Sequence, residues 1–165
     1  MFANQNVIAA AVFALAVVVG PSATAAQPER PLRGSCATVV TPLTEPGVFP
    51  QELRIDLDCT LTHLGRTTGV ALQTVTPTGQ TGAIVTANIE NATTYTAANG
   101  DELSQSFVGT ALINVQTGEV RFIGNETFDG GTGRFAHASG TSELEGTASI
   151  FTNVGFYTTK GRLAY

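Results

Sequence analysis

The stretch FDGGTGRFAHASG, Phe128 to Gly140, places four glycines within thirteen residues. It does not fit a dinucleotide-binding loop, because Ala136 stands where G-x-G-x-x-G has its third glycine and no long helical pattern follows. It does not fit a phosphate-binding loop, because Gly133 is followed by Arg134 and not by Lys. A sharp corner between two strands explains the stretch better, since glycine adopts backbone conformations that other residues avoid.

Four glycines of this stretch are expected to make the corner, and one aromatic side chain to fill the apolar interior beside it. The glycines are Gly130, Gly131, Gly133 and Gly140, and the aromatic residue is Phe135.

Alternating apolar and polar residues lie on both sides of the corner and in much of the remaining chain. Val120–Phe128 leads into it, and Thr141–Thr152 follows. The clearest alternation is Leu53–Leu61, with apolar residues at odd positions and charged or Thr residues at even ones. This period of two is typical of half-buried strands, and no window of about eleven residues after residue 26 has a helical period. Turn signals at Pro77–Gly82, Asn99–Gly100 and Gln116–Glu119 separate the strands.

About eight strands without a covering helix must form a sheet that closes or folds over itself. We therefore predict an all-β fold, an antiparallel eight-stranded β-barrel with no substantial helix, and a β-sandwich is the alternative. Residues 27–50 are polar and rich in Pro, and we expect a lead-in with one short strand, Ser35–Val40. Residues 51–165 are expected to form the main part of a single barrel domain, whose interior holds side chains or one small ligand.

The first 26 residues contain no charged side chain. Their apolar run, Val7–Val19, is shorter than the roughly 20 residues that span a bilayer, and Ala23 and Ala25 give the small-residue spacing of a cleavage site. We interpret residues 1–26 as a secretory signal peptide, although its start has no Lys or Arg, and a retained anchor is the alternative. The predicted location is secreted, periplasmic or in the cell envelope, with no membrane span after cleavage.

The two cysteines, Cys36 and Cys59, are expected to form a disulfide in an oxidising compartment. Two buried thiols are the alternative. Two Cys and two His without close spacing do not make a zinc site, so no metal or other cofactor is predicted. The net charge is −5 and no basic cluster occurs, which argues against nucleic acid as a partner.

The sequence GGTGRFAHASG, followed by Gly146, resembles the motif GGTGxFxxAxG of the barrel family of plant allene oxide cyclases and dirigent proteins. It is most similar to exported bacterial proteins of that barrel type, and Ala97–Asp101, AANGD, matches a turn that they tend to carry. The resemblance covers Tyr95–Tyr165. It implies a calycin-like barrel with an apolar cavity and a dimer or trimer. The motif is a structural turn in that family, so it carries no catalytic residue over to this chain.

Glu126 is the candidate catalytic residue. It shares a strand face with Val120, Phe122 and Phe128. If that face is the barrel interior, burial raises the pKa of the carboxyl and suits it to general acid–base chemistry. The alternative is a solvated surface carboxylate.

A second set of residues is predicted to line a ligand cavity, and core packing or surface pairing is the alternative for each. The set is Tyr95, Phe107, Phe122, Tyr157, His63 and Arg121.

The sequence leaves two functional hypotheses open. The favoured one is a non-catalytic exported barrel that binds a small hydrophobic ligand or serves as an envelope or extracellular component. The other is a cofactor-free cyclase or isomerase that uses Glu126 in an apolar cavity. Two sequons, at Asn91 and Asn125, are relevant only if the host glycosylates exported proteins.

Overall fold

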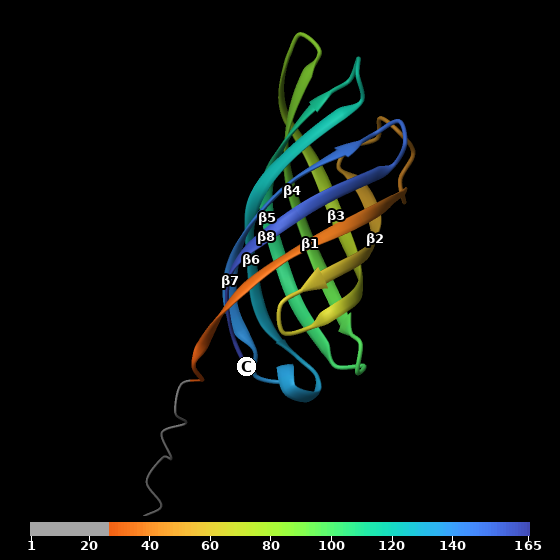
Figure 1. The fold of residues 1–165 in the computed structure, drawn as a ribbon. Coiled ribbons are helices and arrows are strands. Elements are labelled where there is room, and N and C mark those ends of the chain that lie inside the picture. Colours follow the sequence, from red (N-terminus) through yellow and green to blue (C-terminus); the bar gives the residue numbers. More distant parts are fainter. Residues whose placement is uncertain (1–26) are drawn as a thin grey trace, which may run out of the picture.

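The computed structural model describes residues 27–165, and the predicted signal peptide lies outside them. Eight antiparallel strands form one closed barrel in chain order, which confirms the predicted fold (Figure 1). The elements are β1 (Glu29–Pro42), β2 (Gln51–Leu61), β3 (Gly65–Thr81), β4 (Ile84–Ala97), β5 (Glu102–Asn114), β6 (Glu119–Gly131), η1 (Gly133–Phe135), β7 (Ser139–Ser149) and β8 (Val154–Ala164).

Closure depends on the pairing of β1 with β8, from Glu29 opposite Ala164 to Val39 opposite Val154. Every other neighbouring pair is consecutive in the chain. Because the sheet has no free edge, each strand has one face inside the barrel and one face outside. In β2, Leu57, Cys59 and Leu61 are buried inside, as the alternation predicts.

Two strand boundaries differ from the expectations. β1 begins at Glu29 and spans 14 residues, because the polar residues expected as a lead-in pair with β8. The predicted turn Pro77–Gly82 lies mostly within β3, and the chain turns at Gly82 and Ala83. A register shift between Pro77 and Gly79 accommodates proline, which cannot donate to the ladder.

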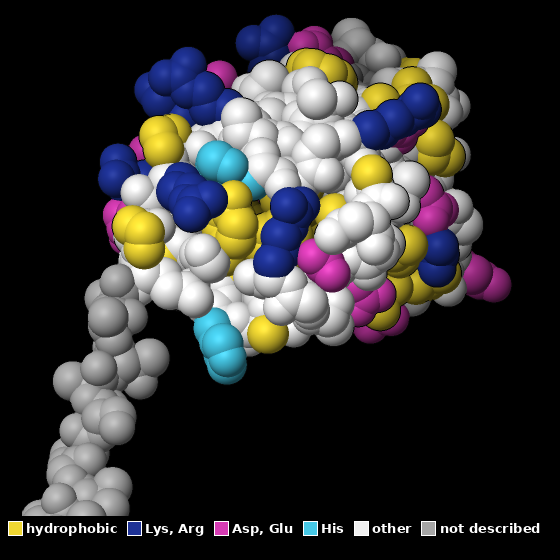
Figure 2. All heavy atoms as spheres, turned by 60° about the horizontal axis from the view of Figure 1, so that its bottom comes forward, with side chains coloured by type: hydrophobic (Ala, Val, Ile, Leu, Met, Phe, Trp, Pro, Cys, Tyr) yellow, Lys and Arg dark blue, Asp and Glu magenta, His cyan; other side chains and the backbone are white. Residues whose placement is uncertain are grey.

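One end of the barrel is filled by side chains. The glycine corner between β6 and β7 lies at this end, which also holds the β2–β3 and β4–β5 turns and the C-terminus (Figure 1). Phe135 is completely buried there and packs on the ring of Tyr165. Viewed from this end, the surface carries basic, acidic and histidine side chains around a small apolar centre (Figure 2).

The glycine corner is fastened to the β4–β5 turn. Thr132 donates its backbone N–H to the Glu102 carbonyl oxygen, and its side-chain oxygen accepts the Glu102 N–H. Arg134 lies 3.7 Å from the Asp101 carboxylate and donates to the His63 carbonyl oxygen at 2.7 Å. The GGTGRF and AANGD motifs therefore form one contact that seals this end of the barrel.

Cys36 and Cys59 stand directly opposite each other in the β1–β2 ladder and form a disulfide. Both residues are buried inside the barrel. The alternative of two separate thiols is therefore wrong. Among residues 27–165, no helix has the length and apolar character needed to cross a bilayer.

Replacement of Gly131 by Val should destabilise the barrel by about 3 kcal/mol. A Cβ atom at Gly131 would lie 2.0 Å from the backbone oxygen of Glu102, which the surrounding ladder holds in place. Gly79→Val is the matched control, because a Cβ atom at that position meets nothing within 4 Å. Thermal unfolding followed by circular dichroism measures both variants. Equal melting temperatures for the two would contradict the structural role of the corner.

The disulfide should stabilise the protein by about 3 kcal/mol in the chain-entropy model, because it closes a loop whose ends are 23 residues apart. We expect Cys36→Ser to lower the free energy of unfolding by about that amount without reductant. In excess reductant the wild type should lose the same stabilisation, so the difference should largely disappear. Urea unfolding under both conditions measures it, and a difference that is unchanged in reductant would argue against the crosslink.

Candidate ligand-binding cavity

The end of the barrel opposite the glycine corner is hollow. A cavity of about 450 Å³ lies there, reached between the β1–β2, β3–β4, β5–β6 and β7–β8 loops. Its walls are mainly apolar and come from most of the strands. Representative lining residues are Leu53, Ile55, Ile89, Phe107, Ile113 and Phe122. A cavity of this size and character is typical of a small-molecule site.

Glycines leave room for the aromatic rings inside the barrel. Gly109 and Gly124 are opposite each other in β5 and β6. A Cβ atom on either would lie within 2.6 Å of the tip of the Phe107 ring. The ring therefore lies over two residues without side chains, which lets an aromatic wall residue and a hollow interior coexist.

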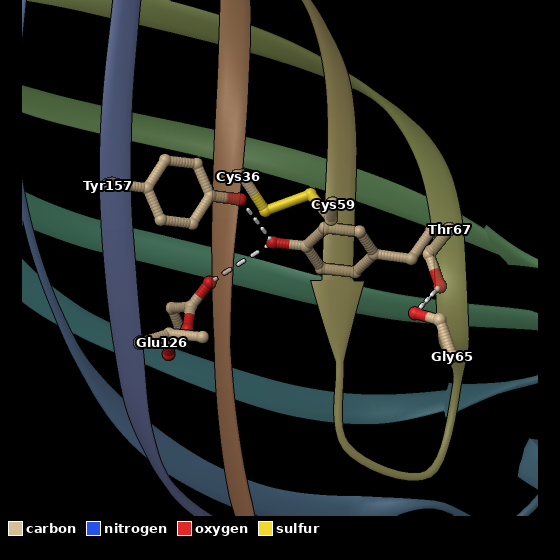
Figure 3. Close-up of a disulfide and its surroundings, with 8 residues drawn as sticks. Cys36, Cys59, Gly65, Thr67, Glu126 and Tyr157 are labelled. Carbon is tan, nitrogen blue, oxygen red and sulfur yellow. Dashed lines mark hydrogen bonds between the residues drawn. A yellow bond between two sulfur atoms is a disulfide. The ribbon is translucent and has the colours of Figure 1, made fainter.

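A polar cluster crosses the barrel interior and joins β4 to β6, β7 and β8 on the opposite wall. Glu126 from β6 is completely buried. Tyr95 from β4 donates its hydroxyl hydrogen to Glu126 Oε1 at 3.3 Å, and the hydroxyl oxygens of Tyr95 and Tyr157, from β8, are 2.8 Å apart (Figure 3). Ser142 and Thr159 bond the other carboxyl oxygen of Glu126. We call Tyr95, Glu126, Ser142, Tyr157 and Thr159 the cross-barrel cluster.

Burial controls the protonation of this cluster. Removal from water raises the pKa of Glu126, and the hydrogen bonds from Ser142, Thr159 and Tyr95 oppose this rise only in part. Burial likewise raises the pKa of Tyr95 and Tyr157, and the neighbouring Glu126 adds to the effect. Both phenols are therefore neutral at ordinary pH and act as hydrogen-bond donors.

The cavity meets the cross-barrel cluster through Tyr157. This residue lines the cavity, whereas Glu126 does not. A hydrogen-bonded path runs from Tyr157 through Tyr95 to Glu126. The two phenols therefore offer the carboxyl a path for proton exchange with the cavity, and the carboxyl itself does not line the cavity.

The structure separates the predicted ligand-binding residues into three groups. Phe107, Phe122 and Tyr157 line the cavity, and Tyr95 lies in the cross-barrel cluster. His63 was predicted to line the cavity, but β2 ends at Leu61 and His63 lies in the next turn, at the filled end. Its Nε2 atom is 2.9 Å from the carbonyl oxygen of Pro31.

Arg121 also does not reach the cavity. It lies on the outer face of β6 and forms an ion pair with Glu119 at 2.8 Å, which agrees with the alternative prediction of surface pairing.

Sequence reasoning missed the polar side chains of the cavity wall. Gln73, Asn91, Thr93 and Gln105 line it from β3, β4 and β5. Each follows the inward phase of its strand, for example Gln105 between Leu103 and Phe107, so the alternation held the signal. Asn91 also carries one of the two sequons, and it lines the cavity, whereas Asn125 is exposed on the outer face.

Among residues 27–165, no three His, Cys, Asp or Glu side chains lie together in an arrangement that could hold a metal ion. The sulfur atoms of the two cysteines, Cys36 and Cys59, are bonded to each other.

Comparison with solved structures finds two similar chains, both pterocarpan synthase dirigent proteins. The first is 16% identical and has a TM-score of 0.51, and the match covers 86% of this chain and 97% of the other. The second is 15% identical with a TM-score of 0.46, and covers 86% and 88% of the two chains. Neither models of known protein families nor curated protein sequences give a match. The first likeness supports a dirigent-like barrel fold.

Glu126→Gln should change how stability depends on pH. The folded state raises the pKa of Glu126, so it binds the proton more tightly than the unfolded state does. Wild-type stability should therefore fall as the pH rises from about 4.5, the ordinary pKa of Glu, through the raised folded value. The Glu126→Gln variant lacks this pH dependence, because an amide side chain does not titrate. Melting temperatures from pH 4 to pH 9 should show the variant becoming more stable relative to the wild type as the pH rises. A difference that stays constant over this range would contradict a carboxyl whose pKa is raised by burial in the folded state.

Proposed function

We propose that this protein is an exported, non-catalytic β-barrel that binds one small hydrophobic molecule in its open-ended cavity. The observation that carries the proposal is the division of the interior, which is filled at the glycine corner and hollow over about 450 Å³ at the other end. An apolar cavity gains free energy when it exchanges water for an apolar ligand, at roughly 25 cal/mol for each Å² of apolar surface buried.

Export is supported by two features. Residues 1–26 have the composition of a secretory signal peptide. The crosslink between Cys36 and Cys59 is a bond that persists in oxidising compartments and is rare in reducing ones.

A second candidate function is a cofactor-free cyclase or isomerase. The observation that favours it is the hydrogen-bonded path from Tyr157 at the cavity wall to the buried carboxyl of Glu126. Such a path can deliver a proton to a ligand or remove one. The non-catalytic function is better supported, because Glu126 lies outside the cavity and the cross-barrel cluster already satisfies both of its oxygens.

Binding can be tested with the neutral fluorophore N-phenyl-1-naphthylamine. We expect the wild type to bind it at about one molecule per chain. Ala111→Phe, which puts a ring into the cavity wall, should weaken binding about tenfold or more. Thr110→Phe is the matched control, because the neighbouring residue is exposed on the outer face. Circular dichroism checks that both variants fold, and Ala148→Phe offers a second way to fill the cavity.

Failure of the wild type to bind the fluorophore, or equal binding by all variants, would overturn the proposal. Native mass spectrometry of protein secreted by its own host then identifies any bound molecule. Recovery of that molecule chemically unchanged after prolonged incubation with the wild type supports the binding function, and its conversion by the wild type but not by Tyr157→Phe supports the cyclase or isomerase.

A further inference from the structure

We propose that the ligand of this cavity is an electrically neutral amphiphile whose head group both donates and accepts hydrogen bonds, as an alcohol or a primary amide does. The proposal rests on the binding function argued above and specifies the chemistry of the ligand. It excludes carboxylates, and therefore free fatty acids, and it equally excludes cationic amphiphiles.

The wall of the cavity carries no charged side chain. Among the described residues that line the cavity, none is Asp, Glu, Lys, Arg or His. A charged head group that leaves water needs a partner of opposite charge, and without one the transfer costs several kcal/mol. The cavity therefore selects against ions of either sign through desolvation alone.

Anions in particular find no favourable partner in the cavity. Glu126 lies beyond Tyr157, next to the inner end of the cavity, and it is the only acidic side chain buried inside the described barrel. The chain as a whole carries a net charge of −5. No positive side chain lines the cavity to offset this net negative charge, so a carboxylate gains nothing there electrostatically.

Uncharged polar side chains lie side by side on three neighbouring strands of the cavity wall. Gln73 is opposite Asn91 in the β3–β4 ladder, and Thr93 is opposite Gln105 in the β4–β5 ladder. The four side chains thus form a patch on one wall of a mainly apolar cavity, whose other polar lining residues, Thr38, Gln51, Ser149 and Asn153, come from different strands and loops. We call Gln73, Asn91, Thr93 and Gln105 the amide patch.

Hydrogen bonds within the amide patch leave both a hydrogen-bond donor and a hydrogen-bond acceptor free to bond a ligand. Asn91 donates to the Gln73 side-chain oxygen at 3.4 Å and accepts from Thr93 at 3.1 Å. The amide hydrogens of Gln73 remain to be donated to a ligand oxygen. Gln105 is 4% exposed, and its Oε1 atom has no hydrogen-bond partner among residues 27–165. A buried hydrogen-bond acceptor without a partner costs free energy. A ligand O–H or N–H that donates to Gln105 Oε1, after a rotation of the Gln105 side chain, removes that cost.

A series of ligands with one tail and three head groups tests the proposal. The probes are 1-decanol, decanoate and decyltrimethylammonium, each titrated at pH 8 against bound N-phenyl-1-naphthylamine. We expect 1-decanol to displace the fluorophore at a concentration about tenfold or more below that needed for either ion. Decanamide should behave like 1-decanol.

A substitution in the amide patch should reverse this selectivity. Gln73→Lys places a positive charge in the cavity wall, and we expect decanoate then to bind more tightly than 1-decanol. Gln73→Leu, which removes the amide without adding charge, should weaken the binding of 1-decanol and leave the binding of decanoate as weak as in the wild type. Leu72→Lys is the matched control for charge, because Leu72 is the neighbouring residue on β3 and is 59% exposed on the outer face. Its head-group preference should match that of the wild type.

The outcomes separate this inference from the proposed function. Equal displacement by decanoate and 1-decanol, or tighter binding of either ion, overturns the neutral ligand while leaving the binding function intact. Absence of fluorophore binding to the wild type overturns the binding function itself. The wild-type series decides the question alone if Gln73→Lys does not fold.

Discussion

The ladder between β1 and β8 is the interaction on which the rest of the structure depends. It turns a meander of eight strands into a closed barrel and so gives every strand an inner and an outer face. Closure brings Tyr95, Glu126 and Tyr157 together across the interior, although the strands that carry them are never neighbours. An open sheet would leave the same residues exposed on one surface, where neither the cavity nor the buried carboxyl exists.

The interior is divided into two parts that serve different purposes. The glycine corner and Phe135 fill one end and hold it to the β4–β5 turn, which supports stability. The other end is hollow, and its apolar walls carry the amide patch. The cross-barrel cluster lies between the two parts and satisfies its own polar groups. A buried network of this kind specifies one arrangement of the strands, because an unpaired member would be costly.

Much of this arrangement follows from the sequence. The period of two identified the strands and placed Glu126 on an inner face, because a closed barrel obeys that period strictly. It failed at His63, where β2 has already ended and the backbone turns with a φ of 73°. It also gave no weight to Gln73, Asn91 and Gln105, since polar residues look like interruptions of an apolar face. Only the register of β3, β4 and β5 shows that these side chains meet.

The disulfide affects how the strands pair while the chain is being synthesised. Of the eight strands, β1 is made first and its neighbour β8 last, so one edge of β1 stays unpaired until β8 has been made. An open strand edge invites pairing with other molecules, and charged residues such as Arg30 and Arg33 on β1 discourage it. The bond from Cys36 to Cys59 joins the two earliest strands, which can pair while the others are still missing. The disulfide therefore holds β1 in register with β2 until β8 is available to pair with it.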